Sequence, residues 1–257
     1  MKNISIFLVL VCFVGCTNLN KQDSTIDLIE EYSLQNSSKE CDVIERTDLS
    51  LNEKENLIGW YYLNLNGEFN ITQDYTKALY WFEKSAEANN NEALNSLGMM
   101  YHLGLGVIKD LNKAEKYYIK ANEQNNKDSK FNLAELYKSS VFEGSPDYEK
   151  ARSWYLLGIQ DNPSRAYEGL SKIAIEQKNF EEAFIYSKKA AELGNTEAEY
   201  NLGVFFEQGV YVKKDIEKAI YWYRKAAKKG HKDAIHNLRV LASTGTVENR
   251  EMNWRLY

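Results

Sequence analysis

Proline, cysteine and histidine are all scarce in this chain of 257 residues, and each shortage excludes a class of protein. The only two prolines, Pro146 and Pro163, leave long stretches in which a helix meets no breaker. Three cysteines are too few for a disulfide framework, and three scattered histidines with no cysteine cluster predict no metal site. Phosphate-binding loops and nucleophile motifs are also missing. We therefore expect no catalysis, cofactor, metal or small-molecule substrate.

The chain also lacks an excess of basic residues. Its formal net charge is −5, and its hydrophobic and charged fractions of 44% and 27% are ordinary for a soluble, folded protein. Binding to nucleic acid needs a basic stripe, so nucleic acid is not an expected partner.

Long hydrophobic runs are absent except for one short run near the N-terminus. The positive start Met1-Lys2-Asn3 precedes the apolar residues 4–14, too few for the roughly 20 that span a bilayer. This arrangement is typical of a secretory signal peptide, predicted over residues 1–15. Residues 13–16, Phe-Val-Gly-Cys, resemble the lipobox of bacterial lipoproteins, although leucine is usual where Phe13 stands.

The lipobox resemblance implies removal of the signal and lipidation of Cys16. Thr17, in place of aspartate, then implies sorting to the outer membrane, facing the periplasm. The alternative is an ordinary cleaved signal peptide that leaves Cys16 as a free thiol. Residues 16–49 are polar and irregular, and we expect a tether that contains the lone thiol Cys41. A disulfide between Cys16 and Cys41 remains open only if Cys16 carries no lipid.

Five alanines recur at spacings of 36, 37, 32 and 36 residues, each in the same local pattern. A helix-capping residue stands four positions before each alanine and a large aromatic residue three positions after it. A period in this range indicates stacked structural repeats. The alanines are Ala78, Ala114, Ala151, Ala183 and Ala219, and the predicted caps are Asp74, Asp110, Asp147, Asn179 and Asp215.

Two repeats match almost position for position. Leu97, Gly98 and Ala114 of the second repeat correspond to Leu202, Gly203 and Ala219 of the fifth. This pattern resembles the Sel-one-like repeat, a member of the tetratricopeptide superfamily. The resemblance implies an all-α fold, a right-handed α/α superhelical solenoid of about five helix pairs over residues 50–244. Residues 231–244 form its closing helix, and residues 245–257 are a tail.

The same resemblance implies that the first helix of each repeat lines a concave binding face. Several inward positions carry large apolar residues, as interface hot spots do. The alternative is that these side chains pack against neighbouring helices. The candidate partner-binding residues are Asn56, Trp60, Asn95, Met99, Phe131, Glu135, Tyr200, Val204 and Glu207.

The sequence thus predicts a non-catalytic, lipid-anchored adaptor of the cell envelope that binds a protein or peptide partner. The alternative is a periplasmic immunity protein that inhibits a secreted antibacterial toxin, such as a phospholipase. Two further readings have less support, a host-interacting virulence factor and a penicillin-binding hydrolase. Repeat proteins described as penicillin-binding are rich in paired cysteines, which this chain lacks.

Overall fold

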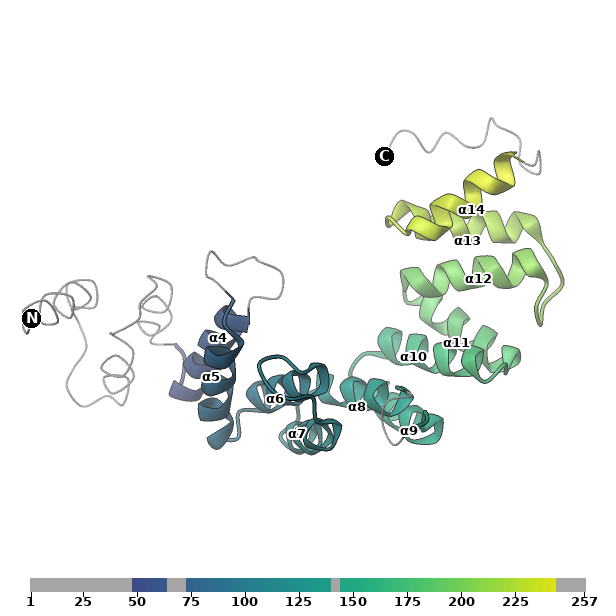
Figure 1. The fold of residues 1–257 in the computed structure, drawn as a ribbon. Coiled ribbons are helices and arrows are strands. Elements are labelled where there is room, and N and C mark those ends of the chain that lie inside the picture. Colours follow the sequence, from purple (N-terminus) through teal and green to yellow (C-terminus); the bar gives the residue numbers. More distant parts are fainter. Residues whose placement is uncertain (1–47, 64–72, 140–143, 244–257) are drawn as a thin grey trace, which may run out of the picture. The chain divides into compact units, whose positions relative to one another are not determined.

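The computed structural model describes residues 48–63, 73–139 and 144–243, and every regular element in these ranges is a helix (Figure 1). The predicted signal peptide, Cys16, nearly all of the tether and the tail lie outside the described residues, as do residues 64–72 of the first repeat. The chain divides into two units, residues 1–129 and 130–257. None of the described helices is both long and apolar enough to cross a membrane.

Unit 1 contains two helix pairs. Helix α4 (Leu51–Leu63) packs against α5 (Tyr75–Glu87), and α6 (Asn91–Leu103) packs against α7 (Leu111–Glu123). The boundary between the units falls in the first turn of α8 (Asp128–Lys138). The core of unit 1 centres on the fully buried rings of Trp81 and Phe82.

Unit 2 continues the same succession of helices. The first helices of its repeats are α8, α10 (Pro163–Glu176) and α12 (Thr196–Gln208), and their second helices are α9 (Tyr148–Gly158), α11 (Phe180–Glu192) and α13 (Ile216–Lys228). Helix α14 (Lys232–Ser243) packs against α13 and closes the series. The predicted fold class, an all-α solenoid of five helix pairs and a closing helix, is confirmed.

The repeated alanines and their caps explain why the second helices form where they do. All five alanines are fully buried, as small side chains at a close-packed helix contact should be. Each predicted capping side chain accepts a hydrogen bond from the backbone N–H three residues later. These bonds satisfy N–H groups that the first turn of a helix leaves without a partner.

The closing helix has no glycine at the position where α12 has Gly203. Aligning Ala234 and Leu238 with Ala198 and Leu202 places Arg239 where the fifth repeat has Gly203. Gly203 is buried against Tyr223, whereas Arg239 is exposed. A terminal element of a solenoid needs a polar outer side, and Arg239 supplies it.

Candidate functional site

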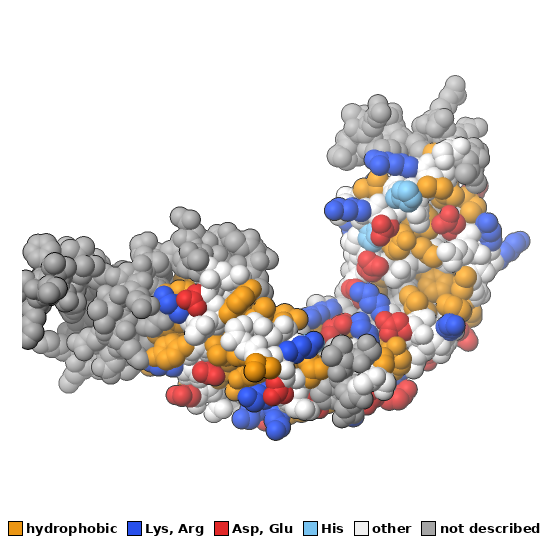
Figure 2. Space-filling view, in the orientation of Figure 1, with side chains coloured by type: hydrophobic (Ala, Val, Ile, Leu, Met, Phe, Trp, Pro, Cys, Tyr) orange, Lys and Arg blue, Asp and Glu red, His pale blue; other side chains and the backbone are white. Residues whose placement is uncertain are grey.

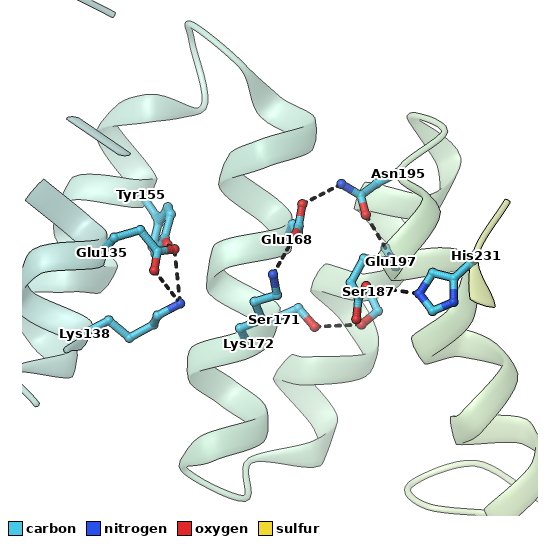
Figure 3. Close-up of polar contacts among 11 residues, drawn as sticks. Glu135, Lys138, Tyr155, Glu168, Ser171, Lys172, Ser187, Asn195, Glu197 and His231 are labelled. Atoms are coloured by element: carbon cyan, nitrogen blue, oxygen red, sulfur yellow. Dashed lines mark hydrogen bonds and ion pairs between the residues drawn. The ribbon is translucent and has the colours of Figure 1, made fainter. Parts of the chain in front are cut away.

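The first helices of unit 2 carry polar side chains that bond to one another (Figure 3). They belong to α8, α10, the start of α12 and the start of α14. Over unit 2, acidic, basic and histidine side chains are interspersed with hydrophobic ones (Figure 2). We call the set the polar row; its members are Glu135, Lys138, Glu168, Lys172, Asn195, Glu197 and His231.

Glu135 is held by two donors. Lys138 Nζ lies 2.8 Å from Glu135 Oε2, and the Tyr155 hydroxyl of α9 donates to Glu135 Oε1. Burial raises the pKa of Glu135, but the hydrogen bonds from Lys138 and Tyr155 outweigh burial and hold that pKa below its usual value. Burial, reinforced by the charge of Glu135, raises the pKa of Tyr155. The carboxylate is therefore ionised and the phenol neutral at neutral pH.

Glu168 links α10 to the cap of α12. Its Oε1 accepts from Lys172 Nζ at 2.5 Å, and its Oε2 accepts from Asn195 Nδ2 at 2.7 Å. Burial lowers the pKa of Lys172, but the hydrogen bond and charge of Glu168 outweigh burial and raise that pKa. Asn195 Oδ1 also accepts from the N–H of Ala198 at 2.9 Å. Asn195 thus caps α12 and also bonds to Glu168 on α10.

His231 takes the capping position before α14. Its Nδ1 accepts from the N–H of Ala234 at 3.2 Å, and its Nε2 lies 3.1 Å from Glu197 Oε2. Because Nδ1 accepts, this network assigns the neutral tautomer in which Nε2 carries the proton and donates to Glu197. The ring also stacks on Tyr200, with centroids 4.5 Å apart and planes at 15°.

Tyrosines of the second helices support the first-helix side chains. Tyr223 packs on Gly203, donates to Glu207 Oε2 at 2.5 Å and accepts from Asn237 Nδ2 at 3.1 Å. Burial, followed by the bond to Glu207, raises the pKa of Tyr223. In unit 1 the Tyr118 hydroxyl lies 3.4 Å from His102 Nδ1. The same position of three repeats therefore directs a neutral phenol at a polar first-helix residue.

Two of the predicted partner-binding residues are buried. The Phe131 ring is 1% exposed and lies under the Arg165 guanidinium, 4.5 Å from its carbon. Asn56 is 5% exposed, and its Nδ2 donates to Glu92 Oε2 at 2.9 Å. Both side chains therefore contact a neighbouring helix, Phe131 through Arg165 of α10 and Asn56 through Glu92 of α6.

The other predicted residues are accessible in part. Trp60 is 36% exposed, although its ring meets Phe82 edge-on at 5.8 Å. Glu135, with its side chain 46% exposed, belongs to the polar row. Asn95, Met99, Tyr200, Val204 and Glu207 are half-buried. In unit 2 the structure brings Tyr200 and Glu207 close to the same tyrosine, Tyr223.

Glu135 is the only member of the polar row among the predicted binding residues, although the sequence contains a signal for two others, Asn195 and His231. A capping residue recurs before every first helix from α6 onward, and its side chain accepts from the N–H three residues later. Four members of this series are asparagines and the last is a histidine: Asn90, Asn126, Asn162, Asn195 and His231.

Within the described residues, no group of three or more histidine, cysteine, aspartate or glutamate side chains could hold a metal ion.

Comparisons with known proteins match the repeats. The Sel1 repeat model matches five consecutive segments, residues 55–90, 91–126, 127–163, 164–195 and 196–231. The crystal structure of a Sel1 repeat protein from Oxalobacter formigenes is similar, with 30% identity and a TM-score of 0.66; the match covers 78% of this chain and 82% of that one.

Two curated relatives are similar over shorter stretches. A sel1-like repeat-containing protein of Acanthamoeba polyphaga mimivirus is 31% identical over 131 residues, covering 49% of this chain and 24% of the relative. A component of an ERAD-associated E3 ubiquitin-protein ligase from Arabidopsis thaliana, HRD3B, is 35% identical over 79 residues, covering 30% of this chain and 11% of the relative. The matched stretches thus span less than a quarter of these relatives' lengths.

Proposed function

The chain belongs to the Sel1 repeat family, and from that premise we propose that it binds a protein or peptide partner on the first-helix face of unit 2, without catalysis. The polar row is the observation that carries this proposal. Its charged groups are already oriented by bonds to one another and to a buried tyrosine. Side chains that are ordered before binding lose little entropy when a partner arrives.

The composition of this face favours a polypeptide partner. The carboxylates Glu135 and Glu168 each stand beside a lysine, so the face presents donors and acceptors without a strong net sign. Tyr200 and Val204 contribute partly accessible apolar surface on α12. Apolar contacts bordered by polar groups are the usual anatomy of a protein interface.

Two isoleucines with similar exposure allow a matched test of the face. Ile175 of α10 lies one turn after Lys172 and is 36% exposed, whereas Ile185 of the second helix α11 is 41% exposed. A photoreactive amino acid at Ile175 should crosslink one dominant partner in the native envelope, and the same group at Ile185 should not. The proposal fails if both positions yield the same products or if only Ile185 yields one.

The partner's identity separates the two functions that the sequence leaves open. An envelope-assembly component crosslinked at Ile175 would support an adaptor. A secreted toxin that loses its activity on binding would instead support an immunity protein. A peptidoglycan or penicillin adduct without any protein partner would contradict both.

The cellular address is a separate proposal, supported by residues 1–17 of the sequence. We propose that Cys16 carries the lipid and that the protein is anchored in the outer membrane, facing the periplasm. Metabolic labelling with a radioactive fatty acid should mark the wild-type protein and not the Cys16→Ser variant. A Cys16→Ser protein that stays in the membrane fraction would contradict anchoring through this residue.

A further inference from the structure

Helix α13 and its flanks carry an unusual concentration of positive charge. Residues 213–232 contain eight lysines and arginines but only two acidic residues, in a chain whose net charge is −5. The overall composition of the chain does not account for so many basic residues in one segment. We therefore ask where these side chains lie on the surface.

The charges on α13 share one side of the helix. Lys218, Tyr221, Lys225 and Lys228 follow one another at spacings of three and four residues, which places them along one stripe. Ala219, Tyr223 and Ala226 form the opposite, buried side. Tyr221 in the middle of the stripe is 56% exposed, and the Lys218 side chain is 62% exposed. We call the stripe with its flanking residues Lys214 and Lys232 the lysine face.

The preceding second helix shows that the repeat does not require this charge. In the same register, α11 has Glu182, Ile185, Lys189 and Glu192 where α13 has Lys218, Tyr221, Lys225 and Lys228. The two stripes differ by four units of formal charge while their buried alanines correspond. The lysine face is therefore a property of α13 and not of the fold.

Acidic neighbours neutralise only part of the face. Lys218 Nζ lies 3.0 Å from Asp215, and Lys225 lies 3.4 Å from the buried carboxylate of Glu199. Lys214, Lys228 and Lys232 are exposed and form no ion pair with the described residues. Glu217 and Asp233 are the acidic residues next in sequence to Lys218 and Lys232. The face thus keeps a positive charge.

We propose that the lysine face docks on the surface of a bilayer that contains anionic phospholipids. Lysine ammonium groups attract an anionic membrane surface, and a partly exposed tyrosine is suited to the level of the lipid headgroups. An acidic protein would carry the same negative charge as an anionic membrane and could also bind lysines. The predicted location at a membrane favours lipid. The choice of lipid rests on that proposed location; the binding test below does not, because it is done without the lipid anchor.

Vesicle binding by the full chain carrying Cys16→Ser tests the proposal. The probes are vesicles of phosphatidylcholine alone and vesicles in which roughly one-third is phosphatidylglycerol. Binding to the neutral vesicles measures any contribution of the apolar residues 4–14. The difference between binding to the anionic vesicles and binding to the neutral vesicles measures the attraction to anionic lipid. The test variant is Lys214→Gln/Lys228→Gln/Lys232→Gln. The matched control, Lys116→Gln/Lys120→Gln/Lys127→Gln, removes the same charge from exposed positions in unit 1.

The wild type and the control should bind the anionic vesicles more strongly than the neutral ones, and the lysine-face variant should not. A lysine near an anionic surface contributes roughly a fivefold factor, so three together should lower the anionic partition coefficient by about 100-fold. Binding should also weaken as added salt shortens the screening length. The proposal is overturned if both triple variants lose binding equally, or if the lysine-face variant still binds the anionic vesicles. Poly-glutamate serves as a probe for an acidic protein partner. Binding to poly-glutamate without binding to the vesicles would also overturn the proposal. Loss of Cys16 labelling would affect only the anchor proposal.

Discussion

In four of the five repeats, a small residue on the first helix faces a side chain on the second helix. Glycine meets an aromatic ring in three of them, through Gly59 and Phe82, Gly98 and Tyr118, and Gly203 and Tyr223. In the fourth repeat both are serines, and Ser171 Oγ lies 2.7 Å from Ser187 Oγ. The third repeat has Ala134, and there Tyr155 packs on Gly169 of α10 instead. The distance between the two helices of a repeat thus depends on the pair of side chains that face each other.

Gly98→Leu should lower the free energy of unfolding by about 1–3 kcal/mol or more, through overpacking. A Cβ atom at Gly98 would stand 2.5 Å from Cδ1 of Tyr118, whose ring is buried and cannot move aside freely. Met99→Leu, a volume-conserving change at a half-buried neighbour, is the control and should have the smaller effect. Urea unfolding compares the two, and equal midpoints would show that this crossing tolerates a side chain.

Glu135 should make stability depend on pH in the acid range. Its pKa is lowered in the folded protein, so its stabilising contribution is complete above the pKa of the unfolded chain and is lost as pH falls through the folded-state pKa. Unfolding measured from neutral pH to about pH 3 should show wild type more stable than Glu135→Gln near neutrality. The difference should shrink on acidification. A difference that stays constant with pH would mean that the carboxylate charge plays no part.

Each second helix begins at a capping side chain, and Asp110 shows how much one such residue contributes. Its Oδ1 accepts from the N–H of Lys113 at 2.9 Å. Asp110→Ala should lower the free energy of unfolding by about 1 kcal/mol, whereas Asp110→Asn, which still accepts, should lose less. Thermal or urea unfolding of the pair measures the difference. If the two variants were equally destabilised, the charge of Asp110 rather than its hydrogen bond would be responsible.

The helices could be predicted from the sequence better than the surfaces that they form. The buried alanines, the caps and the crossing glycines follow from spacing within one repeat, so the register alone places them. Arg165 from the following repeat lies over the Phe131 ring, a contact that no pattern within a repeat reveals. The polar row likewise joins side chains of successive first helices, such as Glu168 of α10 and Asn195, the cap of α12. Local periodicity predicts helices, whereas contacts between repeats decide which residues a partner can reach.

At the scale of the whole molecule, helices within each unit pack against their neighbours in chain order. In unit 2, α11 packs against α10 and α12, and α13 packs against α12 and α14. A chain built in this way derives its stability from individual repeats and from the interfaces between neighbours. Local damage should then remain local, which distinguishes a solenoid from a domain with one central core.

Two matched substitutions test this locality. Leu238 of α14 and Leu97 of α6 are both buried, one in the cluster around Tyr223 and the other in the cluster around Trp81. Replacement of either by alanine leaves a cavity and should cost about 2–5 kcal/mol locally. Native-state hydrogen exchange should show that Leu238→Ala weakens protection in α12–α14 and leaves α4–α7 unchanged. Leu97→Ala should do the reverse. If both variants weakened all helices equally, the two units would unfold as one cooperative body, and stability would not be a sum over neighbouring repeats.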